Sequence, residues 1–162
     1  MVMSWTRIES PVGPLLLAGD ESGIAELNFM AGPRGRRPEA GWREDAGPFA
    51  EALRQLRAYF AGELREFDLT LKPAGTPFQL RVWRELQSIP YGETTSYGAL
   101  ASRLGLPHAA RAVGLANATN PISIVIPCHR VIGRDGRLTG YGGGLEVKEK
   151  LLALEGAQRV LL

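Results

Sequence analysis

The chain has 162 residues, of which 44% are apolar and 22% are charged. This balance is typical of one globular domain or two small ones, and it excludes a wholly disordered chain. The apolar runs are too short to span a bilayer, and residues 1–10 lack the pattern of a secretory signal. The single cysteine, Cys128, excludes an internal disulfide and, with only two histidines, argues against a structural zinc site. A reducing, cytoplasmic setting is therefore expected.

The net charge of +2 is unevenly distributed. Residues 1–75 carry nine basic and eleven acidic side chains, whereas residues 76–162 carry ten basic and six acidic ones. The second half also holds both histidines and the cysteine. A mildly basic segment suits a polyanion such as nucleic acid, although many proteins have such an asymmetry by chance.

The first half is predicted to be a small α+β domain, residues 1–75. Turn residues separate three short strand candidates at residues 5–9, 15–18 and 24–29. Residues 31–47 are rich in glycine, proline and arginine, which predicts an exposed loop; its arginines between Arg34 and Arg37 face solvent or contact phosphate. Pro48 begins a helix with apolar spacing through Phe60, and residues 67–71 alternate like a half-buried strand.

The second half, residues 76–162, begins with helical segments. The capping box TPFQ at residues 76–79 begins a helix, and Thr94, Thr95 and Ser96 offer an N-cap for another at residues 97–103. Pro107 opens a third helix at residues 108–118, so that about three residues join the last two helices, the pattern of a helix-turn-helix. The third helix is mostly alanine and glycine with one long charged side chain, Arg111. It is either a tightly packed helix or a helix that approaches DNA closely.

A reactive group is expected where an apolar run ends. Residues 122–126 are predicted to form a strand that Pro127 terminates, which places the Cys128 thiol beside His129 and Arg130. Positive neighbours favour the thiolate, the nucleophilic form of cysteine. A buried, inert cysteine is the alternative, and the proline and the polar neighbours argue against it.

The last predicted helix, residues 145–156, carries an apolar face made by Val147, Leu151 and Leu154. Glu155 lies on or beside that face and in the last turn, where the helix dipole disfavours a carboxylate. A polar partner would compensate for the apolar surroundings and for the helix dipole. One hypothesis is therefore a Cys128–His129–Glu155 relay, in which His129 is that partner. The alternative is a Glu155 side chain that reaches water.

A glycine-rich segment precedes this helix. Tyr141 is followed by Gly142 and two further glycines, which permit the close approach of a planar ligand and leave backbone N–H groups free to donate. The signal is weak alone, and the segment lacks the lysine of a phosphate-binding loop.

Several short motifs together resemble the O6-alkylguanine-DNA alkyltransferase family, in the family's order and spacing. They are SPVGPL (10–15), PYGET (90–94), SYG (96–98), RAVG (111–114), NP (120–121), PCHRVI (127–132), YGGG (141–144) and LLALEG (151–156).

The resemblance implies an α+β protein with an N-terminal ribonuclease-H-like α/β domain and a C-terminal winged helix-turn-helix domain. It implies single-turnover, irreversible transfer of the alkyl group of O6-alkylguanine, or of O4-alkylthymine, from duplex DNA to Cys128. The helix-turn-helix would bind the minor groove and flip the base out of the duplex. No cofactor takes part, and the expected state is a monomer that can cluster on DNA.

The resemblance also assigns site residues. His129 would take the thiol proton through a water, Glu155 would orient His129, and Asn120 would brace the segment before the cysteine. The base pocket would consist of Tyr97, Val131, Tyr141 and Gly142. The DNA contacts would be Arg111, which fills the place of the flipped base, with Ala110, Ala112, Thr94, Thr95 and Ser96.

Two departures from the family bear on these expectations. Gly142 stands where some relatives carry serine, and the chain lacks the cysteines of an N-terminal zinc site, so no zinc is expected. Three alternatives remain: a lesion sensor of the same fold without transfer, a cysteine hydrolase, and a winged-helix regulator. Such sensors typically replace the cysteine, so Cys128 favours the transferase.

Overall fold

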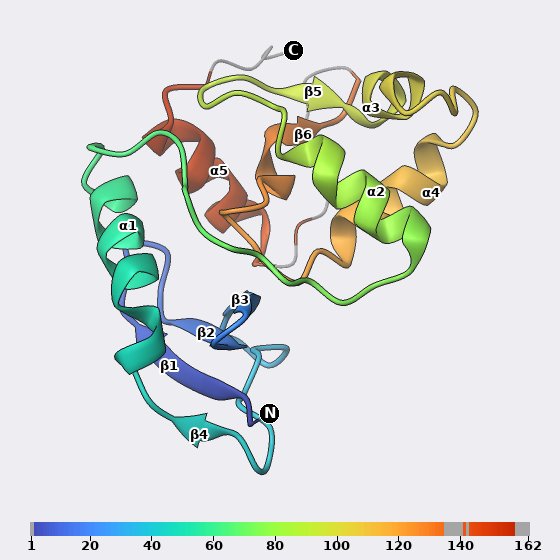
Figure 1. Cartoon of the computed structure of the whole chain (residues 1–162). Helices are drawn as coiled ribbons and strands as arrows, with labels where there is room; N and C mark the ends of the chain where they lie inside the picture. Colours follow the sequence, from blue (N-terminus) through green and yellow to red (C-terminus); the bar gives the residue numbers. More distant parts are fainter. Residues whose placement is uncertain (1, 135–140, 142, 158–162) are drawn as a thin grey trace. The chain divides into compact units, whose positions relative to one another are not determined.

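The computed structural model describes residues 2–134, 141 and 143–157. The chain divides into two compact units, Met1–Ala74 and Gly75–Leu162 (Figure 1). Within the described ranges, no helix has the length and apolar character needed to cross a membrane.

A four-stranded sheet forms the base of the N-terminal unit. Strands β1 (Ser4–Ile8), β2 (Leu15–Asp20) and β3 (Gly23–Phe29) form an antiparallel meander, and β4 (Arg43–Glu44) pairs in parallel with β1. The sheet order is β3-β2-β1-β4. The first five residues of the inner strand β2 are buried, as expected for a strand with neighbours on both sides. The three predicted strands are confirmed, whereas β4 lies in the segment predicted as loop.

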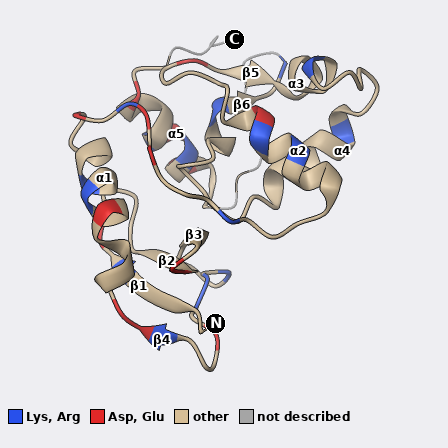
Figure 2. Ribbon diagram, viewed as in Figure 1, with Lys and Arg blue, Asp and Glu red and all other residues tan. Residues whose placement is uncertain are grey.

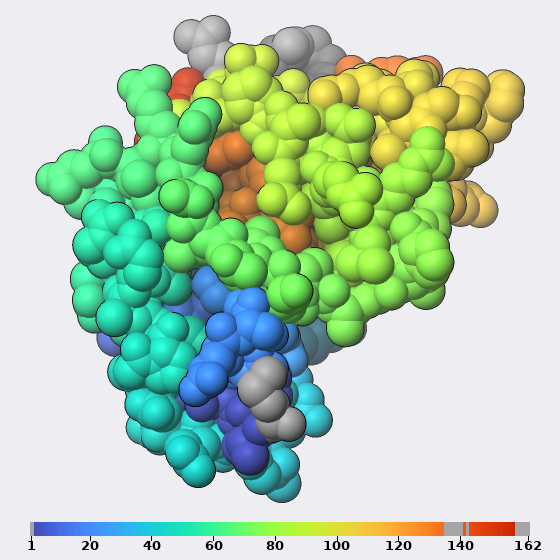
Figure 3. All heavy atoms as spheres, viewed as in Figure 1, coloured from blue at the N-terminus to red at the C-terminus, as the bar shows by residue number. Residues whose placement is uncertain are grey.

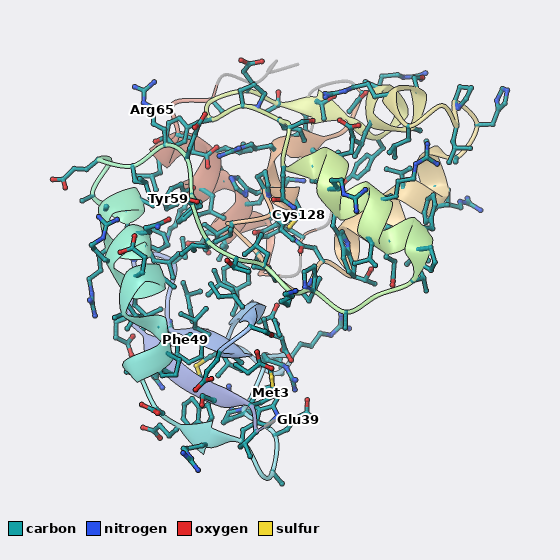
Figure 4. The ribbon with its side chains drawn as sticks, in the orientation of Figure 1. Met3, Glu39, Phe49, Tyr59, Arg65 and Cys128 are labelled. Atoms are coloured by element: carbon teal, nitrogen blue, oxygen red, sulfur yellow. The ribbon has the colours of Figure 1, made fainter. Side chains whose placement is uncertain are left out.

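One helix completes this unit and lies beside the sheet (Figure 1). A 3-10 turn, η1 (Gly47–Phe49), leads directly into α1 (Ala50–Phe60), so the predicted helix is confirmed. Phe49, Leu56 and Tyr59 are buried, and Figure 4 labels Phe49 and Tyr59 near the two ends of α1. Phe49 and Leu56 lie on the predicted apolar face, whereas at its end Tyr59 is buried and Phe60 only half-buried.

The predicted strand at residues 67–71 is wrong. Only Leu71 pairs, in an isolated parallel bridge with Ile24. The buried Gln55 side chain of α1 donates to the Asp68 carbonyl at 3.0 Å and accepts from the Asp68 N–H at 2.9 Å. This side chain satisfies the backbone groups of residue 68 that a neighbouring strand would otherwise satisfy.

Two arginines of the loop after β3 are engaged within the unit. Arg36 donates to Glu26 at 2.7 and 2.8 Å and to Glu39 at 2.6 Å, and its guanidinium lies 5.2 Å from the Trp42 ring centroid. Arg37 donates to the Met30 carbonyl. These contacts order the loop, so the two side chains are not simply solvated.

The C-terminal unit is mainly helical. Thr76 and Gln79 form the capping box at the start of α2, as predicted, and Trp83 Nε1 of α2 donates to the Ala116 carbonyl at 2.8 Å. The elements of this unit are α2 (Pro77–Leu86), β5 (Thr95–Ser96), α3 (Tyr97–Arg103), α4 (Ala110–Ala118), η2 (Cys128–Arg130), β6 (Val131–Ile132) and α5 (Leu145–Leu154).

Helices α3 and α4 form the predicted helix pair, with a longer joint than expected. Helix α3 has the predicted bounds and its N-cap is Ser96, whose Oγ accepts from the Ala99 N–H at 3.1 Å. Helix α4 begins at Ala110, two residues later than predicted, because residues 107–109 form a turn that the Ala109 N–H closes on the Leu106 carbonyl at 2.9 Å. No side chain caps the start of α4, so no local signal marks its beginning.

The apolar run at residues 122–126 forms buried turns, and its prediction as a strand is wrong. The Asn120 side chain supplies the hydrogen bonds instead: Oδ1 accepts from the Ile122 N–H at 3.0 Å, and Nδ2 donates to the Ile126 carbonyl at 2.8 Å. Ile124 has a positive φ of 73°, which no regular strand contains. The Asn120 amide therefore closes both ends of the run.

Candidate active site

The candidate nucleophile lies on the short turn η2, inside the C-terminal unit. Cys128, His129 and Arg130 are consecutive and all buried. Figure 4 labels Cys128 among the side chains of this unit. On the face drawn in Figure 3, atoms from the orange part of the sequence are mostly recessed behind yellow-green atoms. Helix α5 contacts η2, so the reactive segment is enclosed within its own unit.

Cys128 is only 5% exposed, which corrects the expectation that the proline and the polar neighbours keep it out of the interior. Those neighbours are themselves buried, since the turns at residues 122–126 fold inward rather than leading the chain out at a strand end. Burial raises the pKa of the Cys128 thiol. Hydrogen bonds with the Asn120 and Tyr141 side chains and the charge of Lys148 lower the same pKa, so polar groups partly offset the cost of burying a thiolate.

The Glu155 carboxylate bonds with both His129 and Arg130 of η2. Its Oε2 lies 2.8 Å from His129 Nε2, while Arg130 donates from Nε to Oε1 at 2.8 Å and from Nη2 to Oε2 at 3.0 Å. All three side chains are buried. The structure therefore brings His129 and Glu155 together, as the relay hypothesis requires, and Glu155 does not extend into water.

Arg130 is the part of this network that the sequence analysis missed. Besides its two bonds to Glu155, its Nη1 donates to the Ile89 carbonyl at 2.7 Å, and its guanidinium lies 5.8 Å from the Tyr91 ring centroid. No local spacing relates residue 130 to residues 89, 91 and 155, because only the tertiary fold brings these segments together.

The buried face of α5 differs from the predicted one. Val147 and Leu154 are half-buried, whereas the fully buried positions are Lys148, Leu151, Leu152 and, just beyond the helix, Glu155. Lys148 Nζ donates to the Val131 carbonyl at 2.6 Å. Lys148 lies seven residues before Glu155, which places both on the same face of the helix. This spacing is the sequence signal that would have predicted the burial of Lys148.

His129 is held as a proton acceptor. Burial lowers its pKa, which the neighbouring Glu155 carboxylate partly offsets. A neutral imidazole that donates from Nε2 to Glu155 carries its lone pair on Nδ1. This Nδ1 is buried and has no hydrogen-bond partner in the part of the chain that the structure describes. Glu155 thus sets the tautomer, and Nδ1 is the atom available to receive a proton.

Two asparagines support the segment around the cysteine. Asn120 closes the turns at residues 122–126 and bonds with the thiol, as described above. Asn117 of α4 lies with its Nδ2 3.4 Å from the Cys128 carbonyl. The backbone that carries the thiol is therefore tied by side-chain amides to the end of α4.

The residues predicted to form a base pocket are only partly brought together. Val131 is buried directly after η2, and the half-buried Tyr141 lies near enough to Cys128 to lower the pKa of its thiol. Tyr97 begins α3, and its ring lies beside Gly114 of α4, where an added Cβ would be 3.6 Å from the ring. Gly142 lies outside the described residues. Val131 and Tyr141 thus adjoin the thiol, while Tyr97 borders α4.

The residues predicted to contact DNA divide into two sets. Ala110, Arg111 and Ala112 form the first turn of α4, with Arg111 and Ala112 exposed. Figure 2 shows basic positions on α2, α3 and α4. The second set is Thr94, Thr95 and Ser96. Thr95 and Ser96 form β5, which pairs in parallel with β6, and Thr94 directly precedes β5. This set therefore also borders the segment that follows the cysteine.

Family models match most of the chain. Residues 3–73 match the 6-O-methylguanine DNA methyltransferase, ribonuclease-like domain, and residues 77–157 match the DNA binding domain of the same family. These matches confirm the expected fold, an N-terminal ribonuclease-like domain followed by a DNA-binding domain.

Individual relatives resemble nearly the whole chain. The methylated-DNA–protein-cysteine methyltransferase of Methanosarcina acetivorans is 56% identical over 155 residues, which cover 96% of this chain and 99% of that protein. The crystal structure of Mycobacterium tuberculosis O6-methylguanine methyltransferase has 53% identity and a TM-score of 0.89, covering 96% of this chain and 93% of that one. A Mycobacterium tuberculosis OGT structure in complex with DNA has 54% identity and a TM-score of 0.88, covering 94% and 92%.

Proposed function

Because the chain belongs to the 6-O-methylguanine DNA methyltransferase family, we propose that it repairs DNA by moving the alkyl group of O6-alkylguanine onto its own Cys128. The observation that carries this assignment is the single cysteine. Relatives more than half identical are named for transfer to a protein cysteine, and this chain has one cysteine, directly before a buried histidine that bonds with a buried glutamate.

The proposed reaction is a displacement at saturated carbon. The Cys128 thiolate forms a bond to the alkyl carbon while the bond from that carbon to guanine O6 breaks, and the guanine leaves with the electron pair. The proton that left the thiol balances the charge on the released guanine. The thioether formed at Cys128 does not hydrolyse back to the thiol in neutral water, so each protein molecule acts once. O4-alkylthymine is a second substrate of the same chemistry.

The buried network supplies the proton pathway. His129 Nδ1 receives the thiol proton through a bridging water, and Glu155 holds the imidazole in the tautomer that can accept it. Arg130 holds Glu155 by two bonds, so the carboxylate keeps its place beside the imidazole. These groups are positioned before the substrate arrives, which removes the cost of reorganising them during the reaction.

Duplex DNA is the proposed partner, and α4 is the proposed contact. Small side chains at Ala110 and Ala112 let the helix backbone approach the minor groove. Flipping a base costs a few kcal/mol. Arg111, exposed in the first turn of α4, enters the stack and fills the place that the flipped base leaves. Thr94, Thr95 and Ser96 contact the backbone of the duplex beside it.

The flipped base is held next to the thiol. Tyr141 forms one wall of the pocket. The Val131 carbonyl, which has a second lone pair beyond its bond to Lys148, accepts from the guanine amino group. Tyr97 donates to the departing guanine. All of these groups come from one chain, so a monomer suffices for transfer even when several copies cluster on DNA.

The test is a mass measurement after mixing the protein with a duplex that contains one O6-methylguanine. We expect one added methyl group per protein, on the peptide that contains Cys128. Cys128→Ser should gain none, and a duplex with unmodified guanine should add none to the wild type. Tight binding to the methylated duplex without any added mass would refute transfer and favour a lesion sensor.

A further inference from the structure

A large apolar side chain lies on the exposed side of α4. Leu115 is 68% exposed, more than any other large apolar side chain in the described part of the C-terminal unit. A single exposed leucine is ordinary on a protein surface. Its place makes this one informative, because α4 is the helix proposed to contact DNA and its other exposed apolar side chains are alanines.

Helix α4 has two distinct sides. It lies beside α2 and α3 within the C-terminal unit, and Val113, Ala116 and Asn117 form its buried side (Figure 1). The exposed positions follow the opposite side at helical spacing and are Arg111, Ala112, Leu115 and Ala118. Leu115 therefore points away from its own unit, on the same side of the helix as Arg111.

The spacing along α4 limits where Leu115 can meet the duplex. Four residues of α-helix advance about 6 Å along the axis and return to nearly the same side of the helix. Successive base pairs of a duplex are about 3.4 Å apart. With Arg111 in the place of the flipped base, Leu115 reaches the groove at most about two base pairs from it.

A leucine on this side of α4 either holds the helix away from the duplex or enters the groove. The first effect opposes the close approach that Ala110 and Ala112 permit one turn earlier. The second is common among proteins that bind the minor groove, which place leucine and similar apolar side chains against or between base steps. Entry into the groove also removes the exposed apolar surface of Leu115 from water.

We infer that Leu115 is a DNA-contacting residue, whose side chain enters the minor groove within about two base pairs of the gap that Arg111 fills. It packs there against the deoxyribose and base edges. This inference rests on the proposed function, because it concerns the duplex that carries the alkylated guanine. The contact is apolar, so it adds affinity without neutralising a phosphate, whereas phosphate contacts release counterions and make the affinity depend on salt.

The test measures duplex affinity against salt concentration in Cys128→Ser protein, in which Cys128 cannot accept the alkyl group. Adding Leu115→Ala should weaken binding to a duplex with one O6-methylguanine by at least about tenfold, because most of a buried leucine side chain is lost. The slope of log affinity against log salt concentration should not change. Leu115→Met keeps an apolar side chain of similar volume and should retain most of the affinity. Leu115 is exposed and alanine favours helix, so Leu115→Ala leaves the fold intact.

Leu145→Ala is the matched control, since Leu145 is an exposed leucine of the same unit, at the start of α5. Its loss should leave the duplex affinity unchanged. An unchanged affinity in Leu115→Ala would overturn the inference, and so would an equal loss in Leu145→Ala. A weaker affinity with a flatter salt slope would also overturn it, because Leu115 would then act by positioning charged side chains against phosphates.

Free O6-methylguanine base separates this inference from the proposed function. With Cys128 intact, Leu115→Ala should accept a methyl group from the free base at the wild-type rate, because no duplex takes part. An equally slow reaction with duplex and free base would overturn the inference, since the substitution would then act on the surroundings of Cys128. Failure of the proposed function gives a different result: Cys128→Ser protein with Leu115 in place would not bind the duplex.

Discussion

Replacing Glu155 by glutamine separates the charge of this side chain from its shape. Glutamine retains one acceptor oxygen, which can keep one bond to Arg130, but its NH₂ group then faces the position of His129 Nε2. Arg130 remains buried with its positive charge uncompensated. Removing one partner of a buried ion pair costs about 3–5 kcal/mol, and the retained bond places the expected loss near 3 kcal/mol.

The same change should slow transfer. An NH₂ group opposite Nε2 favours the tautomer with its proton on Nδ1, and that atom then no longer accepts the thiol proton. Positioned general-base catalysis contributes about 10²–10⁴-fold, so we expect a loss of at least about a hundredfold. Urea unfolding followed by tryptophan fluorescence and circular dichroism gives the free energy of unfolding. Single-turnover assays with a methylated duplex give the transfer rate.

Glu93→Gln is the matched control, since Glu93 is an exposed carboxylate of the same unit. Its free energy of unfolding should stay within about 0.5 kcal/mol of the wild type, as for most surface substitutions. The reasoning fails if Glu155→Gln behaves like this control in both assays. A stable variant with slow transfer would refute the stability argument alone.

Three further predictions concern DNA binding, the turn before the cysteine and pH. Arg111→Ala should slow repair of duplex DNA while leaving the reaction with free O6-methylguanine base unchanged, measured as the two transfer rates. Asn120→Ala removes two bonds to backbone and should lower the free energy of unfolding by about 2 kcal/mol. Burial lowers the pKa of His129 below 6.5, so the unfolded chain binds the proton more readily and stability should fall as the pH drops below about 6.5. His129→Gln should flatten this dependence of the free energy of unfolding on pH, measured in urea titrations.

Local signals in the sequence were sufficient to predict where several helices begin. Helix α2 begins at its capping box because Thr76 and Gln79 satisfy each other's backbone groups three residues apart. Helix α3 matched its predicted bounds because Ser96 caps its start. By contrast, α4 begins without a side-chain cap, and its prediction was two residues early.

The errors arose where a polar side chain outside the predicted apolar pattern decides the structure. Residues 122–126 have the apolar composition of a buried strand. They form turns instead, because the Asn120 amide bonds with the backbone at both ends of the run. The buried face of α5 was misplaced because the prediction counted only the apolar residues Val147, Leu151 and Leu154, and Lys148 is not one of them. Lys148 and Arg130 become understandable only when the fold brings Val131 and Glu155 to them.

The short parallel pairing of β5 with β6 has a consequence for how the C-terminal unit opens. Thr95 and Ser96 pair with Val131 and Ile132, so the residues that lead into α3 are hydrogen-bonded to those that follow the cysteine. Local unfolding proceeds in contiguous cooperative units. The entry to the helix-turn-helix and the exit from the thiol turn therefore belong to one such unit, and their amides should exchange with solvent together. Loosening one end of this ladder exposes the other, which links the stability of the α3–α4 helix pair to that of the turn that carries Cys128.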